Sequence, residues 1–395
     1  MIVFLTKEEE AMLKGEHGQA VRKSMEILVA LGKIFGADRM LDVTSVQVAG
    51  VSYHNLGDAG LDFLHELSRD GKVRVLTTLN PAGMDIERWK ELGFSEDFAK
   101  KQKQVLDAFS DMGIIQSCTC IPYLVGNLPT FGQHIAWSES SAVCFANSVI
   151  GARTNREGGP SALAAALTGK TPNFGLHLDE NRQAQIIVNV EMEIKGSDWA
   201  ALGLAIGKRI GNKIPLIRGV KTASIEELKS FSASIATYGG TAMFHIDGIT
   251  PNRTTTPSDK ISIGKADIES ARTELNDACD PDFVGIGCPH CSIQEIAEIA
   301  KKLRGKKVSV ATWIFTARQT KAMADMRGYT ADIEHSGAKL VCDTCMAVAP
   351  LKGRFNCLAT NSAKACFYGR GSNNFKTRFG SLDQCIDAAV SGKWK

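Results

Sequence analysis

Three short segments of the sequence each hold two cysteines, and each segment follows a run of residues typical of a β-strand. The pairs are Cys118 and Cys120 in SCTCIPYL, Cys288 and Cys291 in GCPHCS, and Cys342 and Cys345 in VCDTCM. Thiolates bind zinc ions and iron–sulfur clusters. In an open α/β sheet, ligands bind at the edge formed by the carboxyl ends of the strands, so three such loops could converge on one metal centre.

The cysteine spacing leaves the kind of metal centre open. Two C-x-x-C pairs suggest a zinc site, but residues 292–341 separate them, more than the roughly 15–20 residues typical of a compact zinc ribbon. A zinc-stabilised binding scaffold without catalysis is therefore one alternative. An iron–sulfur cluster with four cysteine ligands would suit electron transfer. A cluster with three would leave one iron free to bind a substrate hydroxyl as a Lewis acid.

The other cysteines are predicted to be buried and unligated. The chain has 11 cysteines, an odd number, and its first residues, MIVFLTKEEEAML, lack the basic region of a signal peptide. A disulfide framework is therefore not expected. The cysteines outside the three pairs are Cys144, Cys279, Cys357, Cys366 and Cys385.

Polar side chains crowd several loops that follow predicted strands. Segments 50–60, 77–85 and 132–162 are rich in Ser, Asn, Arg and Gly. Together they favour a small anionic ligand, because Arg offers a bidentate fork to a carboxylate or phosphate. Ordinary turns and helix caps use the same residue types, which is the alternative for any single residue. The candidate substrate-binding residues are Ser52, Tyr53, Asn55, Asn80, Ser140, Ser141, Arg153, Asn155 and Arg156.

Strand and helix patterns alternate along the chain. Predicted strands cover 41–50, 73–79, 114–119, 183–194, 241–246, 282–287, 307–315 and 338–344. Predicted helices cover 7–35, 60–71 and 292–305, with two more within 85–112. This order indicates an α/β protein with several α/β units, largely parallel sheets and crossover helices. The domains are expected at 1–140, 141–265 and 266–395.

Composition excludes several classes of protein. The chain has 395 residues, 44% hydrophobic and 23% charged, as in a globular protein of two or three domains. Its 46 basic and 43 acidic residues give a formal charge of +3, too balanced for a protein whose main partner is nucleic acid. No apolar stretch nears the roughly 18–20 residues that cross a bilayer, so no membrane association is expected. The protein is predicted to be cytoplasmic.

Several segments between about residues 45 and 370 give the sequence a family resemblance. It resembles the large subunit of aconitase X in GVSYHNLGDAG, TTLNPAG, CTCIPYL, HIAWSESSAVCFANSVIGARTNREGGPSAL, FHIDGITP, IGCPH, CDTC and TNSAKACFYGRG. The long central segment is highly specific. Aconitase X is a divergent branch of the aconitase superfamily, and its members are dehydratases made of a large subunit and a small swivelling subunit, sometimes fused. The resemblance implies an aconitase-like fold.

The resemblance also implies a cofactor and its ligands. In this family the motifs C-x-P-Y-L, G-C-P-H and D-T-C bind an iron–sulfur cluster, and here they fall on Cys120, Cys288 and Cys345. The other cysteine of each pair is then not required. We expect a 4Fe–4S cluster that readily loses its exposed iron and decays to 3Fe–4S.

The implied reaction is removal of water. The substrate's C3 hydroxyl would bind the open iron, and a serine of the small subunit would take the C2 proton, so this chain alone should be inactive. His134 is the candidate for hydrogen bonding the leaving hydroxyl, with a purely structural histidine as the alternative. Arg153 and Arg156 are candidates for the substrate's anionic groups.

Two substrates fit the resemblance. Some family members dehydrate cis-3-hydroxy-L-proline. Others convert (R)-5-phosphomevalonate to trans-anhydromevalonate 5-phosphate in a modified mevalonate pathway to isoprenoids. The sequence ends at Lys395 without a fused small subunit, which favours a two-subunit enzyme and the phosphomevalonate reaction.

Overall fold

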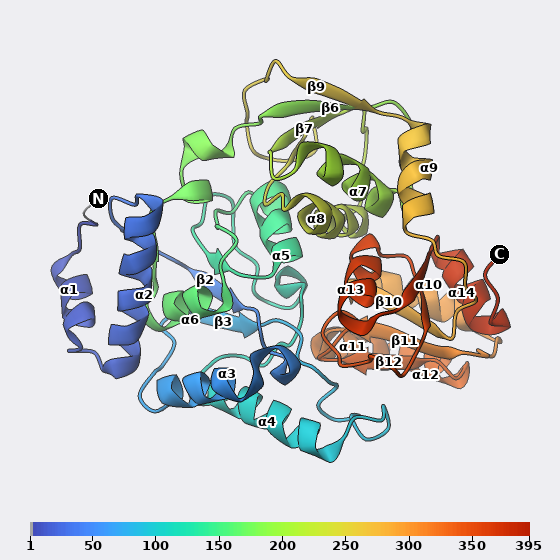
Figure 1. Ribbon diagram of the computed structural model, residues 1–395, viewed down its shortest axis with the longest axis horizontal. Helices are drawn as coiled ribbons and strands as arrows, with labels where there is room; N and C mark the ends of the chain where they lie inside the picture. Colours follow the sequence, from blue (N-terminus) through green and yellow to red (C-terminus); the bar gives the residue numbers. More distant parts are fainter. Residues whose placement is uncertain (1–2) are drawn as a thin grey trace.

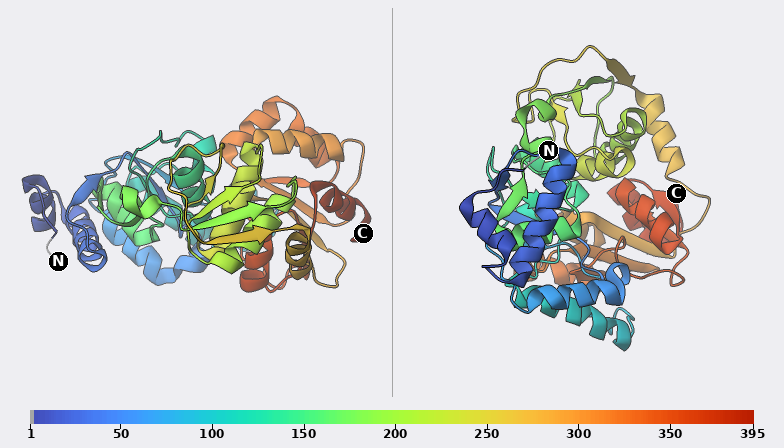
Figure 2. Two further views of the ribbon diagram at one scale, coloured as in Figure 1. Left: turned by 90° about the horizontal axis from the view of Figure 1, so that it is seen from above. Right: turned by 60° about the vertical axis from the view of Figure 1, so that its left-hand side comes forward.

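Three α/β units surround a common centre in the computed structural model, which describes residues 3–395. The first unit carries the N-terminal helices and the third the C-terminus, so the two ends of the chain lie at opposite ends of the molecule (Figure 1 and Figure 2). Within the described residues, we find no helix with the length and apolar character that a membrane crossing requires.

The first unit is built on a small parallel sheet. Its elements are α1 (Lys7–Lys14), α2 (Gln19–Phe35), β1 (Met40–Asp42), β2 (Ser45–Val48), α3 (Tyr53–Ser68), β3 (Leu76–Leu79), α4 (Glu96–Asp111), η1 (Pro122–Leu124), β4 (Ala136–Trp137), α5 (Ser140–Phe145), η2 (Ala146–Ile150), α6 (Gly159–Thr168), β5 (Lys170–Pro172), η3 (Gly175–His177) and η4 (Asp179–Arg182). The strand order is β3-β2-β4, and β1 pairs with β5 in a separate antiparallel ribbon. Apolar residues of α3, α4 and α6 form one core with this sheet.

The second unit is a parallel sheet covered by tightly packed helices. Its elements are β6 (Ile186–Val190), α7 (Asp198–Ile210), β7 (Pro215–Arg218), α8 (Ile225–Gly239), β8 (His245–Ile246), β9 (Lys260–Ile263) and α9 (Lys265–Glu274). The strand order is β8-β7-β6-β9. Helices α7 and α8 touch at Gly203, where an added Cβ would stand only 2.5 Å from the Cβ of Ser234.

The third unit holds the largest sheet. Its elements are β10 (Phe283–Cys291), α10 (Ile293–Leu303), β11 (Ala311–Thr316), α11 (Arg318–Met326), α12 (Tyr329–His335), β12 (Lys339–Cys342), β13 (Cys357–Thr360), α13 (Ala363–Asn373), β14 (Lys376–Phe379) and α14 (Leu382–Ser391). The strands are parallel in the order β12-β11-β10-β13-β14. Every residue of the central strand β10 is buried, as expected for a strand covered on both faces.

The predicted α/β class with parallel sheets and crossover helices is confirmed, and three details differ. The helix predicted over 7–35 is two helices, because Gly15 and Gly18 between them have φ values of 87° and 99°, which interrupt a right-handed helix. Only one helix, α4, forms within 85–112, since residues 85–94 run as turns along the third unit. The strand predicted at 114–119 is reduced to a single bridge between Ile115 and Thr78.

The boundaries between units lie later in the chain than 140 and 265. Helix α6 and strand β5 return to the first unit, where Leu163 and Leu167 join its core. Helix α9 stays with the second unit, because Ile268 and Ala271 pack into the core that includes its sheet. The sequence shows no change in composition at these points, so it does not predict that residues 140–182 belong to the first unit.

One disulfide corrects the prediction for two of the cysteines. Cys279 and Cys357, expected to be unligated, form a disulfide across a sequence separation of 78 residues. It ties the connection after α9 to the first residue of β13, beside the point where Asp282 accepts a hydrogen bond from the Cys357 N–H. A single staple of this kind is not a disulfide framework, and the odd cysteine count did not exclude it.

Replacing Cys279 with Ser should lower the free energy of unfolding by about 4 kcal/mol, because the disulfide restricts a long loop in the unfolded chain. Denaturant titration of the cluster-free chain, followed by circular dichroism, measures this loss. A reductant should bring the wild-type chain to the stability of C279S and leave C279S unchanged. A wild-type chain that is indifferent to reductant would contradict the assignment of the disulfide.

Candidate functional site

Cys288 lies at the middle of the carboxyl edge of the largest sheet. Strand β10 bulges between Ile286 and Cys291, where its register with β11 shifts. Gly287 permits the bulge: its φ is 108°, and an added Cβ would stand 2.3 Å from the carbonyl oxygen of Phe315. The strand order reverses at β10, with β11 on one side and β13 on the other. Ligands bind at such a switch point in open α/β sheets.

Cys120 lies at the same kind of edge in the first unit. The N–H of Thr119 donates to the Leu79 carbonyl at the end of β3 (3.0 Å), and the side-chain amide of Gln47 on β2 donates to the Thr119 carbonyl (2.9 Å). Two buried strands therefore fix the main chain of the residue just before Cys120.

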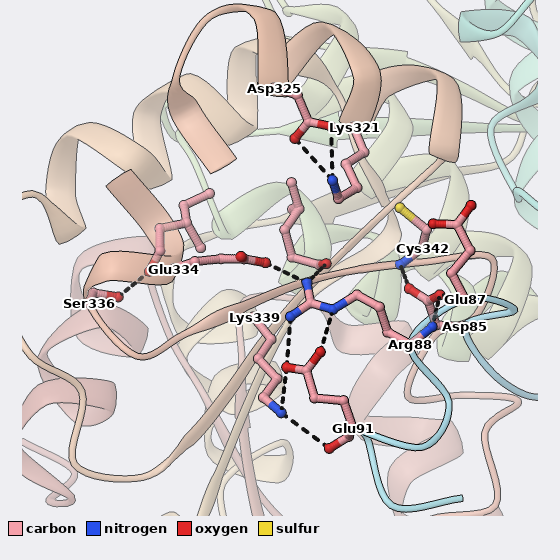
Figure 3. A network of polar contacts seen from close by, with 12 residues as sticks. Asp85, Glu87, Arg88, Glu91, Lys321, Asp325, Glu334, Ser336, Lys339 and Cys342 are labelled. Atoms are coloured by element: carbon pink, nitrogen blue, oxygen red, sulfur yellow. Dashed lines mark hydrogen bonds and ion pairs between the residues drawn. The ribbon is translucent and has the colours of Figure 1, made fainter. Parts of the chain in front are cut away.

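The loop that carries Cys345 belongs to the third unit but is fixed by the first. The Ala82 N–H donates to the Asp343 carbonyl (2.7 Å), and the Cys342 N–H donates to the Asp85 carboxylate (2.8 Å). Asp343 itself has a φ of 63° and pairs with Arg318. Figure 3 shows Asp85 against the Cys342 backbone.

Ion pairs next to this loop join the same two units. In Figure 3, Arg88 of the first unit lies between Glu91 and Glu334 of the third-unit helix α12, with which it forms ion pairs. Lys339 on β12 reaches back to Glu91 at 3.0 Å. The turns at 85–94 therefore form part of the frame that holds the Cys345 loop.

The side chain of His290 joins all three cysteine loops. It is fully buried, with Nδ1 at 2.9 Å from the Thr119 hydroxyl and Nε2 at 2.9 Å from the Thr344 carbonyl. Because a carbonyl only accepts, Nε2 carries the proton and Nδ1 accepts from Thr119. Burial lowers the His290 pKa to about 4, so the ring is neutral at pH 7. The His290 backbone N–H donates to Cys120 Sγ at 3.3 Å.

Cys120, Cys288 and Cys345 lie close enough for their charges to act on one another. All three residues are at most 8% exposed. Burial raises the pKa of Cys345 well above its ordinary value, and the charges of the Cys288 and Cys120 thiolates raise it further. Burial likewise raises the Cys120 pKa to about 12, with Cys288 contributing. These thiols are therefore protonated at pH 7 unless a cationic group binds them.

The remaining cysteines of the three pairs have other neighbours. Cys291 lies in the field of Glu295, of Lys229 and, more weakly, of Cys120, and Cys342 in that of Asp343 and Asp85. A four-cysteine zinc site made of the two C-x-x-C pairs would need all four sulfurs together. Within residues 3–395, no three His, Cys, Asp or Glu side chains are grouped as ligands of one metal ion.

The donor set fits an iron–sulfur cluster. Three buried sulfurs come from three separate loops, and a backbone N–H already donates to one of them. Clusters are held by cysteine thiolates and tuned by hydrogen bonds to sulfur and by burial. The ligands of a cluster bind different irons, so they need not converge on a single point as the ligands of one ion do.

A buried ion pair stands beside the three sulfurs. Lys364 on α13 pairs with Glu139, which caps α5 and accepts from the Ser141 hydroxyl at 2.8 Å and from the Asn80 amide at 2.9 Å. Burial alone would raise the Glu139 pKa, but Lys364 and Ser141 lower it to about 2. Burial alone would lower the Lys364 pKa, but the Glu139 carboxylate raises it. Both groups are therefore charged.

A cavity of about 540 Å³ reaches Cys288 from between the second and third units. Ser362 and Asn361, at the end of β13, line it together with Glu226 of α8 and Glu295 of α10. Its volume is in the range of small-molecule sites.

The structure brings some of the predicted substrate-binding residues to the sulfurs and leaves others apart. Asn80 and Ser141 bind Glu139, and Ser140 begins the same helix, α5. The Ser52 hydroxyl donates to the Val348 carbonyl (3.1 Å) near the Cys345 loop. Tyr53 instead donates to Asp58.

Of the four predicted residues that remain, three make other contacts or are exposed. Asn55 is exposed on α3, and Arg156 is exposed before α6. The Asn155 side chain is used by the main chain of η3, where its oxygen accepts from the Leu176 N–H at 2.8 Å.

His134 and Arg153 form a different cluster, which corrects their predicted roles. His134 precedes strand β4 and so lies at its amino end, whereas Glu139 follows the carboxyl end. Nδ1 of His134 is 2.9 Å from Nδ1 of His177, and Arg153 donates to the His177 carbonyl and pairs with Asp179. Burial lowers the pKa of His177 to about 3. Neither residue is placed to act on a group at the three sulfurs.

Sequence reasoning missed the residues that organise the site. His290, Glu139 and Lys364 all lie inside segments that carry the family resemblance, but none was singled out. Lys364 offered a signal, since a lone charge among Ser, Ala and Cys in TNSAKACF indicates a buried, paired cation. His290 offered only its place between two cysteines.

Comparisons with known proteins place the whole chain in one family. Models of the aconitase X first, second and third domains match residues 2–180, 184–273 and 281–391. The phosphomevalonate dehydratase large subunit of Methanothermobacter thermautotrophicus is 49% identical over 93% of this chain and 94% of its own length. The cis-3-hydroxy-L-proline dehydratase of Pseudomonas aeruginosa is 36% identical over 98% of this chain and 70% of its own length.

A solved structure extends the likeness to three dimensions. The crystal structure of Thermococcus kodakaraensis aconitase X in its holo form superposes with a TM-score of 0.92 at 46% identity, covering 98% of this chain and 100% of that one. The matched domains, the relatives and the superposition agree along nearly the whole sequence, and the chain belongs to the aconitase X family.

Proposed function

We propose that this chain is the large subunit of a cytoplasmic hydro-lyase that removes water from (R)-5-phosphomevalonate to give trans-anhydromevalonate 5-phosphate. The proposal rests on one observation: three buried cysteines lie close together, and the Lys364–Glu139 ion pair lies beside them. The choice of substrate rests on relatives: those named phosphomevalonate dehydratase large subunit reach 49% identity, and those named cis-3-hydroxy-L-proline dehydratase reach 36%.

Cys120, Cys288 and Cys345 would hold an iron–sulfur cluster, 4Fe–4S in its complete form and 3Fe–4S after loss of the exposed iron. When bound, such a cluster supplies a Lewis acid that makes a substrate hydroxyl a better leaving group. Three protein ligands support this role better than electron transfer, because they leave one iron without a protein sulfur.

The polar residues of the chain would bind and orient the substrate. The Lys364 ammonium has three protons, one given to Glu139 and one directed at Ser141 (3.4 Å), so the third is available to an anionic oxygen near the sulfurs. Glu139 is held in turn by Asn80 and Ser141, which fixes the ammonium in one place. Ser362 and Asn361 line the neighbouring cavity and offer further hydrogen bonds.

A small subunit completes the proposed enzyme. The relatives are named large subunits, which implies a partner of this kind. The base that takes the substrate's C2 proton would come from it, because the buried carboxylate beside the sulfurs, Glu139, is engaged by Lys364 and too weak a base at a pKa of about 2.

The purified two-subunit enzyme, made by co-expression with the small subunit under anaerobic conditions, should dehydrate (R)-5-phosphomevalonate. The large chain alone should be inactive. We expect kcat/KM for cis-3-hydroxy-L-proline to be at least ~100-fold lower, a difference of about 2.7 kcal/mol in transition-state binding. A preference for the proline substrate would overturn the assignment of substrate and keep the reaction class.

Exchanging the proposed cluster ligands one at a time should abolish the cluster. Cys120→Ser, Cys288→Ser and Cys345→Ser should each lose the absorbance near roughly 400 nm that thiolate–iron charge transfer produces. Cys291→Ser and Cys342→Ser are matched controls from the same loops and should retain it. Full activity in any of the first three variants would disprove the ligand set.

Removing one partner of the buried ion pair should cost far more than removing both. Glu139→Gln and Lys364→Met should each lower the free energy of unfolding by about 3–5 kcal/mol, because each leaves or creates an unpaired buried polar group. The double variant should lose less free energy of unfolding than either single variant, as denaturant titration of the cluster-free chain would show. Strictly additive losses would mean that the two side chains do not interact.

A further inference from the structure

One buried lysine reaches the cysteine loops from the second unit. Lys229 of α8 is only 2% exposed, and its ammonium donates to the His290 carbonyl at 2.8 Å. It also forms an ion pair with Glu295 of α10. Lys229 therefore links the second unit directly to His290, whose side chain contacts Thr119 and Thr344.

The partner of Lys229 is itself held in place. Glu295 accepts the Ser292 N–H at 2.8 Å in the capping box that starts α10, directly after the cysteine-bearing strand. The Ser292 hydroxyl donates to Glu226 on α8 at 2.9 Å. Two polar links therefore clamp residues 290–295 to α8, and Lys229 makes the buried one.

Burial of Lys229 disfavours its charged form unless a negatively charged group lies nearby. Burial alone would lower its pKa, yet the neighbouring Glu295 carboxylate raises it. The ammonium therefore stays charged. If this side chain only filled space between α8 and β10, an apolar residue would give the same or greater stability, because a buried ion pair rarely adds net stability over well-packed apolar residues.

Two effects on the sulfurs follow from these contacts. The Lys229 bond to the His290 carbonyl restrains the main chain whose N–H donates to Cys120 Sγ. Its charge also lies in the field of Cys120 itself. Hydrogen bonds to sulfur and nearby positive charge both favour the reduced form of an iron–sulfur cluster and disfavour its oxidation.

We propose that Lys229 is a positioning residue for the metal centre: it holds the His290 peptide against Cys120 and supplies a buried positive charge that protects the cluster from oxidation and loss of its exposed iron. This inference rests on the proposed function, since it needs a cluster on Cys120, Cys288 and Cys345. It assigns the second unit a part in the centre although that unit contributes none of the three sulfurs.

The test compares Lys229→Met with wild type in the reconstituted two-subunit enzyme. The reduction potential of the cluster is measured by anaerobic spectroscopic titration with dithionite, and iron loss is followed after exposure to air. We expect one-electron reduction of K229M to be about tenfold less favourable, which is about 59 mV lower for a one-electron couple. Its cluster should also decay several-fold faster.

Three further variants make the result specific. Lys302→Met removes a lysine of α10 that pairs with Asp383 at the surface, and should match wild type. Lys229→Arg keeps the positive charge, so its reduction potential should lie close to that of wild type. Glu295→Gln removes the negative partner and should shift the potential upwards, opposite to K229M, which keeps the test open if K229M folds poorly.

The outcomes separate this inference from the proposed function. A wild-type enzyme that binds no cluster would refute the proposed function. A wild-type enzyme with a normal cluster, together with a K229M potential equal to that of wild type and K302M, would refute the role of Lys229 alone. Faster decay with an unchanged potential would also refute it, because the proposed protection acts through the charge.

Discussion

The centre of this protein depends on one neutral, fully buried histidine. His290 can accept a hydrogen bond from Thr119 and donate one to Thr344 at the same time only as the neutral, Nε2-protonated ring; burial keeps the ring neutral by lowering the pKa to about 4, and the Thr344 carbonyl fixes the proton on Nε2. Each bond holds the residue that immediately precedes a cysteine of the proposed ligand set. The main chain of His290 adds the N–H to Cys120 and the carbonyl to Lys229. A change in this one side chain would therefore displace loops from two units.

Charge in this interior is arranged in pairs, and the pairs sit where they serve the sulfurs. Lys364, Glu139 and Lys229 are buried and Glu295 is half-buried, and desolvation opposes the charge of each lysine. Such pairs are weak evidence for stability. Their placement around the cysteines gives a better reason for their presence: a set of thiolates carries negative charge, which two ammonium groups partly offset. Each carboxylate fixes the position of its ammonium, so the positive charge stays near the cysteines.

The sequence predicted the fold class and the cysteine loops, because both depend on local patterns. Strands β10 and β12, which end in cysteines, can be recognised from a few consecutive residues. The role of His290 could not, since its partners lie 171 and 54 residues away along the chain. His134 was misjudged for a related reason: a motif shows that a histidine is near a strand, but only the fold shows that it precedes β4 rather than follows it. The first predicted domain boundary was too early because residues 159–172 return to the first unit, where they contact strands β1 and β2 from more than a hundred residues earlier in the chain.

The distribution of sulfurs over the units has a consequence for folding. Cys120 comes from the first unit, and Cys288 and Cys345 come from the third, so a group bound by all three ties those units together. Because the unfolded chain presents no such site, binding shifts the equilibrium towards the folded arrangement. The protonated state of the free thiols opposes binding, since each must lose a proton first. The polar links through His290 and Lys229 need no metal, so they hold the cysteine loops of the units close to one another in the free chain as well.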